Sequence, residues 1–102
     1  MADKRMYIYK ITCVFNGKIY IGRTVKSIKK RLNEHFYESR YVKNNRPLYL
    51  DMKKYGKSGF IIELILEFYS KNKNYADAKE REYIDEYDSW HPKGYNVTRI
   101  RQ

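Results

Sequence analysis

The chain of 102 residues and 12.5 kDa has the length of a single domain, residues 1–102, with a net charge of +10 and a pI near 9.7. Its one cysteine, Cys13, excludes an internal disulfide and a cysteine-based zinc site, and no apolar run reaches the roughly 20 residues of a membrane span. Twelve tyrosines, four phenylalanines and one tryptophan can form a core, which argues against a disordered basic tail. We expect an intracellular basic domain whose partner is a polyanion rather than a membrane.

The beginning of the chain predicts two strands joined in a hairpin. Residues 6–11 and 18–22 are rich in β-branched and aromatic side chains, and Asn16-Gly17 between them suits a type I′ turn. A two-residue turn sets Phe15 opposite Lys18, and this register gathers on one face Tyr7, Tyr9, Ile11, Tyr20 and Gly22. Tyrosine is also an ordinary strand residue that packs across a sheet, and strand chemistry alone favours that plainer interpretation.

Two helices are predicted next. Thr24 or Ser27 can cap a first helix that runs to about Ser39, with a buried stripe formed by Ile28, Leu32 and Phe36. Pro47 suits the first turn of a second helix, which ends near Gly56.

The second half of the chain predicts a strand, a helix and a turn. Residues 60–68 are rich in Ile, Leu and Phe, which indicates a third strand buried on both faces. Residues 75–88 predict a third helix, followed by a turn at 90–94 and a short extended piece at 95–97. The order of elements predicts a small α/β domain of the α+β type, with a three-stranded antiparallel sheet flanked by about three helices.

Most of the positive charge lies in the middle third of the chain. Residues 23–57 hold eleven basic and three acidic side chains, whereas residues 58–102 hold seven and eight. A face that only keeps a domain soluble usually mixes signs, so this one-sided stretch favours a nucleic-acid backbone as partner. The side chains expected to contact phosphates are Arg23, Lys26, Lys29, Lys30, Lys53 and Lys54.

One acidic residue of the predicted third helix has an unusual position. Only Glu80 projects from the middle of the apolar arc, whereas Glu82 points nearly opposite to it. Burying an uncompensated carboxylate costs several kcal/mol, so such a residue normally has a cationic partner. Helical periodicity leaves three alternatives open: a structural Arg or Lys, a position at the core edge that reaches water, or a divalent metal.

Arg31 and His35 stand four residues apart on one flank of the first helix, so they can act on the same small region. An arginine holds phosphate through its planar fork, and a histidine can exchange a proton near neutral pH. An exposed basic ridge would show the same spacing, and the pair alone does not distinguish the two.

Taken together, these residues resemble a GIY-YIG nuclease domain. Its two tripeptides match Tyr7-Ile8-Tyr9 and Tyr20-Ile21-Gly22, and an Arg on the next helix and a Glu on a later one follow them. Later family segments are similar to Lys53-Lys54-Tyr55-Gly56, Glu80-Arg81-Glu82-Tyr83-Ile84 and Gly94-Tyr95-Asn96. The resemblance covers about residues 6–98 and is closest to the catalytic domains of phage-type homing endonucleases. Tyr7 replaces the first glycine of the motif, a residue with no chemical role in hydrolysis.

The resemblance implies a Mg²⁺- or Mn²⁺-dependent endonuclease that hydrolyses phosphodiester bonds in DNA with low sequence specificity. Carried over position by position, the family's active-site roles fall on Tyr9, Tyr20, Arg31, His35, Glu80 and Asn96. Glu80 would hold the metal ion, a tyrosine would orient or deprotonate the attacking water, and Arg31 would neutralise charge on the phosphoryl oxygens. His35 would assist proton transfer or hold a tyrosine, and Asn96 would support the site by hydrogen bonding.

Two rival functions fit parts of the same pattern. A non-catalytic DNA- or RNA-binding module would keep the fold and the basic face, and an RNA-binding protein would use tyrosines for stacking. Neither rival needs a core-facing carboxylate at position 80. Homing enzymes of the family usually attach a separate DNA-binding module, and a chain of this length is expected to lack one. We therefore expect an excised catalytic domain, a stand-alone nuclease, or a subunit targeted by another domain or protein.

Overall fold

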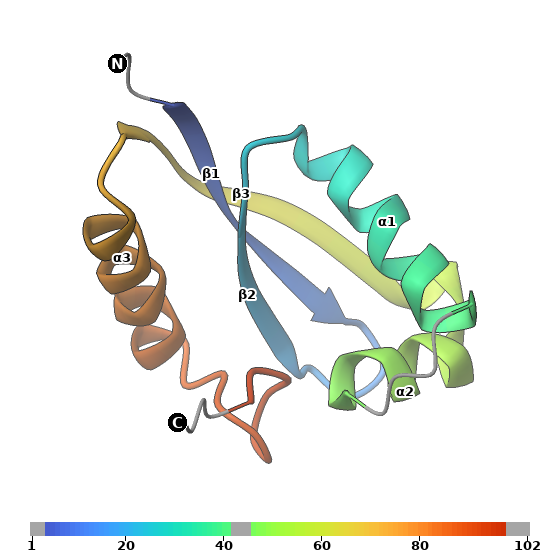
Figure 1. Ribbon diagram of the computed structural model, residues 1–102. Helices are drawn as coiled ribbons and strands as arrows, with labels where there is room; N and C mark the ends of the chain where they lie inside the picture. Colours follow the sequence, from blue (N-terminus) through green and yellow to red (C-terminus); the bar gives the residue numbers. More distant parts are fainter. Residues whose placement is uncertain (1–3, 42–45, 98–102) are drawn as a thin grey trace.

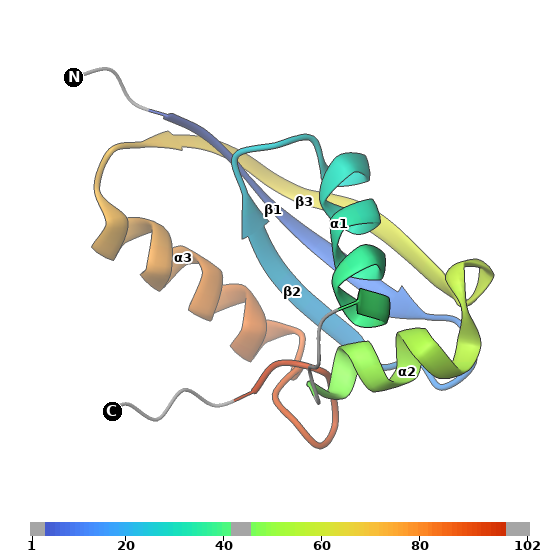
Figure 2. The ribbon, with the colours of Figure 1, turned by 45° about the vertical axis from the view of Figure 1, so that its right-hand side comes forward.

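The computed structural model describes residues 4–41 and 46–97. Three strands form an antiparallel sheet in the order β2-β1-β3 (Figures 1 and 2), namely β1 (Lys4–Cys13), β2 (Ile19–Thr24) and β3 (Phe60–Ser70). The helices are α1 (Ile28–Tyr41), α2 (Pro47–Tyr55), the short 3₁₀ turn η1 (Lys57–Gly59) and α3 (Lys73–Glu86). The predicted α+β class and order of elements are confirmed. No helix within the described ranges is long and apolar enough to cross a bilayer.

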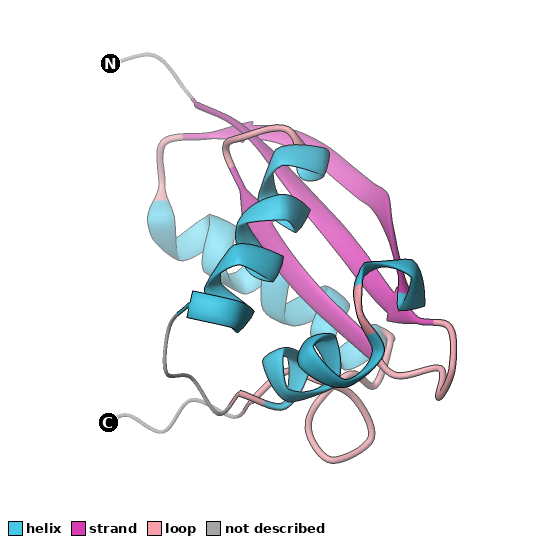
Figure 3. Ribbon diagram, turned by 90° about the vertical axis from the view of Figure 1, so that its right-hand side faces the viewer, coloured by secondary structure: helices cyan, strands magenta, loops and turns pink. Residues whose placement is uncertain are grey.

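The sheet is covered on both faces, so it separates two cores. Helices α1 and α2 pack on one face and α3 lies behind the other (Figure 3). The core under α1 and α2 contains Tyr9, Ile11, Cys13, Phe36, Leu48, Tyr49, Met52, Phe60 and Tyr95. The core under α3 contains Ile8, Ile21 and Ile84. Successive residues of β1 thus point into different cores, as the alternation of a strand requires.

The hairpin between β1 and β2 has the predicted faces but not the predicted turn. Ile11 pairs with Tyr20, and the Cys13 N–H donates to the Lys18 carbonyl at 3.0 Å, so the loop has four residues instead of two. Its Phe15 ring stacks on Tyr55 of α2 with ring centroids 5.0 Å apart, a contact that a two-residue turn would lose. The pairing shifts by two residues, and because side chains alternate with period two, every residue keeps its face.

The helix ends follow the predicted signals with small shifts. Ser27 caps α1, because its hydroxyl accepts from the Lys30 N–H at 3.2 Å. Helix α2 ends at Gly56, which has a φ of 76° that favours glycine. Helix α3 begins two residues earlier than predicted, where the Asn72 side chain accepts from the Tyr75 N–H at 3.2 Å.

Strand β3 corrects one expectation, since it is not buried on both faces. Ile61, Leu64 and Tyr69 are each about half exposed, at 51%, 50% and 55%. The strand runs eleven residues along the edge of the sheet, where its two faces need not both be covered by helices. Its pairing with β1 shifts between Ile8 and Tyr9, which marks a β-bulge. An apolar run predicts a strand, but it does not distinguish a central strand from an edge.

Candidate active site

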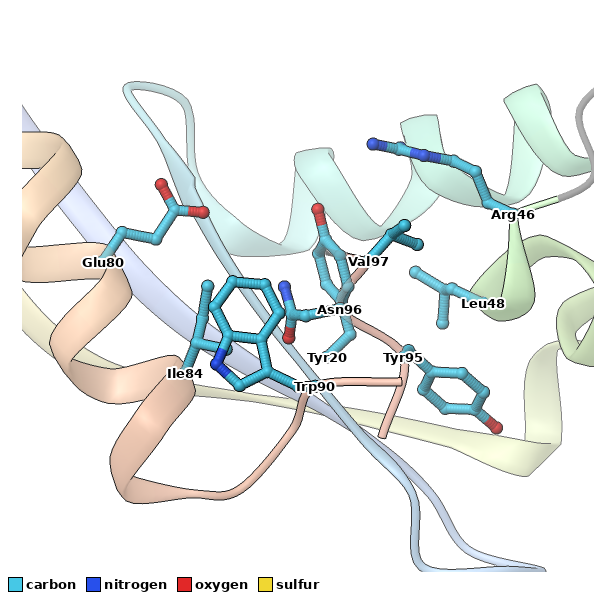
Figure 4. A pocket seen from close by; sticks show the side chains of 9 residues that line it. All are labelled: Tyr20, Arg46, Leu48, Glu80, Ile84, Trp90, Tyr95, Asn96 and Val97. Carbon is cyan, nitrogen blue, oxygen red and sulfur yellow. The ribbon is translucent and has the colours of Figure 1, made fainter. Parts of the chain in front are cut away.

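A pocket of about 520 Å³ opens beside β2, at the outer edge of the sheet. Segments far apart in the sequence line it (Figure 4): Tyr20 of β2, Arg46 and Leu48 at the start of α2, Glu80 and Ile84 of α3, and Trp90, Tyr95, Asn96 and Val97 of the loop after α3. Glu80, expected to hold the metal ion, and Tyr20, expected to orient the attacking water, thus line the same pocket.

Glu80 lies on the sheet-facing side of α3. Ala76 and Ile84, one turn before and one turn after it, are both buried, and the Glu80 side chain is 25% exposed. One guanidinium nitrogen of Arg23 lies 3.4 Å from Glu80 and 2.9 Å from Asp77. Glu82 is 59% exposed and pairs with a lysine on its own helix. The predicted helix phase is therefore confirmed: Glu80 sits at the edge of the core, and a structural cation lies beside it.

Tyr20 presents its hydroxyl to the pocket between Glu80 and Arg46, both of which reach toward it (Figure 4). Burial raises the pKa of Tyr20 above its usual value, and Glu80 adds to that rise. Arg46 and Arg31 act in the opposite direction and stabilise the phenolate. Without a further cation, the hydroxyl therefore keeps its proton near neutral pH and can orient a water or a phosphate by hydrogen bonding.

Tyr9 lies beneath the pocket rather than in it. Its side chain is 1% exposed, and its hydroxyl oxygen is 2.8 Å from Nε2 of His35, which is fully buried. Burial, followed by the charges of Arg31 and Arg46, lowers the pKa of His35 to about 3, so its ring is neutral at pH 7. A Cβ at Gly22 would overlap the Tyr9 hydroxyl, which gives the glycine of the second tripeptide a steric role.

Arg31 lies next to this buried pair, as the spacing of the helix predicts. It forms ion pairs with Glu34 at 3.1 Å and Glu38 at 3.7 Å. Burial raises the pKa of Tyr9, and Arg31 is close enough to that hydroxyl to oppose the rise. The structure therefore brings Arg31 and His35 to one place, beside both tyrosines of the motif.

Asn96 joins the loop after α3 to β2. Its Oδ1 accepts from the Ile21 N–H at 2.9 Å and from the Ser89 hydroxyl at 2.7 Å, and its Nδ2 donates to the Ile21 carbonyl at 2.9 Å. The side chain is 6% exposed, so these bonds are shielded from water. Its side chain therefore ties Ser89, in the loop after α3, to Ile21 of β2. This link helps to fix the positions of Tyr20 and Gly22, the neighbours of Ile21.

The residues expected to contact DNA do not gather in one place. Arg23 is engaged with Asp77 and Glu80, and Lys26 pairs with Glu34 at 2.6 Å. Lys30 borders the same shallow hollow on α1 as Lys26, whereas Lys53 lines a different one between α1 and α2. Lys29 and Lys54 are exposed on α1 and α2. Their contact with DNA stays a prediction.

Sequence reasoning missed Arg46, whose guanidinium reaches over the pocket. It directly precedes Pro47 at the start of α2, where the helix dipole disfavours a positive charge. A cation at a helix N-terminus is therefore a signal that could have drawn attention to it. The reasoning also missed Trp90, Glu38 and Tyr49, which a local pattern gives no reason to select.

Comparison with known proteins identifies the chain as a nuclease catalytic domain. The model described as the GIY-YIG catalytic domain matches residues 5–96, so the chain belongs to the GIY-YIG family of nucleases. This match confirms the resemblance that the sequence motifs of the chain indicate.

Solved structures agree with this assignment. The catalytic domain of homing endonuclease I-TevI is 25% identical, with a TM-score of 0.75 over 92% of this chain and 99% of that one. A mutant of the catalytic domain of intron endonuclease I-TevI is 24% identical, with a TM-score of 0.76 over 99% of this chain and 98% of that one. Among curated proteins, none matches the sequence significantly.

Proposed function

We propose that the protein is a divalent-metal-dependent endonuclease that hydrolyses phosphodiester bonds in DNA. The observation that carries this proposal is the pocket in which the Glu80 carboxylate, the Tyr20 hydroxyl and the Arg46 guanidinium surround one hollow. A guanidinium suits a phosphate, and a hydroxyl suits the water or an oxygen of the reacting group. A module that only binds nucleic acid has no use for a carboxylate there, because it repels the backbone.

The donor set fits a magnesium or manganese ion. In the described part of the chain, no group of three or more His, Cys, Asp or Glu side chains is arranged to hold a metal ion, which argues against an all-protein metal cage. Mg²⁺ is usually held by one or two carboxylates, with water and substrate phosphate completing its shell. Glu80 offers one such carboxylate at the pocket wall. When bound, the ion would supply Lewis-acid stabilisation of the leaving oxygen.

The protein's own side chains would orient the reactants and stabilise the charge that develops during hydrolysis. Tyr20 orients the attacking water or a phosphoryl oxygen through its hydroxyl, which Arg46 and Arg31 polarise. The two guanidinium groups neutralise charge that develops on the phosphoryl oxygens. His35 holds Tyr9 beneath Tyr20, and this buried support fixes the positions of the reacting side chains.

Recognition of DNA would rest on the phosphate backbone. The exposed lysines of α1 and α2 offer contacts that carry no base information, so we expect weak affinity, low sequence specificity and a steep dependence on salt. A targeting domain or a protein partner would supply any selection of sites. Tight binding of one short sequence that persists at high salt would contradict this expectation.

A plasmid assay tests the proposal. We expect the protein to nick or linearise supercoiled DNA with Mg²⁺ or Mn²⁺, and a chelator to abolish the reaction. Glu80→Ala should lose cleavage while keeping the fold by circular dichroism. Glu82→Ala is the matched control, because the same residue type on the same helix points to solvent and should keep its activity. Equal losses in both variants would contradict the role of Glu80, and DNA binding without cleavage in the parent protein would favour a binding module.

A further inference from the structure

A chain of hydrogen bonds leads from beneath the pocket to the surface of α1. The Tyr9 hydroxyl is 2.8 Å from His35 Nε2, and His35 Nδ1 is 2.9 Å from the Tyr49 hydroxyl. Tyr49 in turn donates to Glu38 Oε1 at 2.6 Å. Tyr9, His35 and Tyr49 are at most 1% exposed, whereas the Glu38 side chain is 39% exposed. The chain thus links β1, α1 and α2, and only its last member meets solvent.

The carboxylate at the surface end fixes the direction of each bond. A carboxylate only accepts, so Tyr49 uses its single proton on Glu38 and can only accept from His35. Nδ1 of His35 therefore carries the proton. The ring is neutral because burial and the charge of Arg31 lower its pKa to about 3, so Nε2 is a bare acceptor. Tyr9 consequently donates its own proton to Nε2.

The donation of the Tyr9 proton to His35 matters for Arg31, which lies close to the Tyr9 hydroxyl. A guanidinium has donors and no acceptor, so it is compatible with a Tyr9 oxygen that presents lone pairs. If His35 carried its proton on Nε2, it would donate to Tyr9. The Tyr9 O–H would then turn toward its other neighbours, and it would compete with the remaining lone pair of the oxygen for the side that faces Arg31.

We propose that Tyr49 and Glu38 are positioning residues of this nuclease, which fix His35 as the Nδ1–H tautomer and so keep the Tyr9 oxygen an acceptor for Arg31. Neither residue belongs to the motifs that mark the family's active site in the sequence. The effect on cleavage rests on the proposed function. The tautomer itself does not, because it is a property of the protein without metal or DNA.

Nitrogen-15 NMR of labelled histidine reads the tautomer directly. The chain has two histidines, and the exposed His91 serves as an internal reference for His35. We expect the Nδ1–H form of His35 at pH 7. Tyr49→Phe keeps the ring, whose centroid lies 5.5 Å from the Arg46 guanidinium, and removes the hydroxyl, so His35 should shift toward Nε2–H. Tyr55→Phe on the same helix is the matched control, because its ring contact remains.

Single-turnover cleavage by saturating protein measures the consequence for Arg31. Tyr49→Phe should lower the rate roughly tenfold or more and change the DNA Kd by less than about twofold, as expected when the partner of an oriented histidine is lost. An unchanged tautomer in this variant would overturn the hydrogen-bond assignment. A changed tautomer with an unchanged rate would overturn the positioning role. If the parent protein does not cleave DNA, the proposed function and the positioning role both fall, while the NMR result still decides the hydrogen-bond chain.

Glu38→Ala tests the same assignment if Tyr49→Phe does not fold, since Glu38 lies at the surface. Without the carboxylate, the Tyr49 hydroxyl can rotate and donate to Nδ1, so we expect a mixture of His35 tautomers. The double variant should resemble Tyr49→Phe, because the two residues act in series on one nitrogen. A pure Nδ1–H signal in Glu38→Ala would overturn the role of the carboxylate.

Discussion

Replacing Asn96 by alanine tests how the loop after α3 holds β2. The substitution removes both hydrogen bonds to the Ile21 backbone, at 2.9 Å each, and the acceptor of the Ser89 hydroxyl at 2.7 Å. Ile21 is itself fully buried, so bulk water does not reach its N–H and carbonyl unless the pocket that Asn96 lines extends to them in the variant. The variant leaves two backbone groups unsatisfied inside the protein.

The expected loss of stability follows from these two unsatisfied backbone groups. Each buried donor or acceptor left without a partner costs about 1–3 kcal/mol, which gives a loss of about 4 kcal/mol for the pair. Domains of this size have a total unfolding free energy of about 5–15 kcal/mol. Because 1 kcal/mol shifts the Tm of a 60–100-residue domain by about 4–8 °C, we expect Asn96→Ala to lower the Tm by about 15–30 °C.

Urea unfolding followed by circular dichroism, with a thermal melt at the same pH, measures both quantities. Asn74→Ala is the matched control, because Asn74 is exposed on α3 and its loss should change stability by less than about 0.5 kcal/mol. If Asn96→Ala lowers the free energy of unfolding by less than about 1 kcal/mol, water or a neighbouring group hydrogen-bonds the N–H and carbonyl of Ile21. The loop would then not be what holds the strand carrying Tyr20.

Three further substitutions test other parts of the site. Gly22→Ala drives a methyl group into the Tyr9 hydroxyl, so we expect a loss of about 1–3 kcal/mol in urea unfolding; an unchanged midpoint would mean that the ring moves freely. Arg31→Lys keeps the charge but loses the planar fork, so single-turnover cleavage should fall about tenfold or more with little change in Kd. If Arg31→Lys cleaves DNA at the parental rate, Arg31 contributes only charge to the basic surface. Arg23→Gln should weaken DNA binding less than Lys30→Gln, because two carboxylates already engage Arg23; the reverse order in salt titrations would identify Arg23 as a phosphate contact.

Periodicity explains what could be predicted from the sequence. The hairpin faces are correct despite the wrong turn, because a shift of two residues returns each side chain to the same side of the sheet. Glu80 is correctly placed for a similar reason, since Ala76 and Ile84 mark the buried side of α3 at helical spacing. Both inferences depend only on the spacing of residues within one hairpin or one helix.

Contacts between elements could not be predicted in the same way. Tyr49 and Glu38 meet because α1 and α2 pack at a particular angle, and no local pattern encodes that angle. Arg46 reaches the pocket only because α2 begins beside β2 and the loop after α3. The apolar run of β3 is equally compatible with a central or an edge strand, so the sequence predicts burial on both faces where the structure leaves Leu64 half exposed.

The separation of the core by the sheet divides the candidate active site into two halves that pack against opposite faces of the sheet. Glu80 belongs to the half under α3, whereas Tyr9, His35 and Arg31 belong to the half under α1 and α2. The halves meet beside β2, where Glu80 of α3 and Tyr20 line one pocket, so a small rotation of α3 would change the position of the carboxylate relative to the Tyr20 hydroxyl. Under the proposed function, cation affinity and phosphate binding would therefore depend on different sets of core residues.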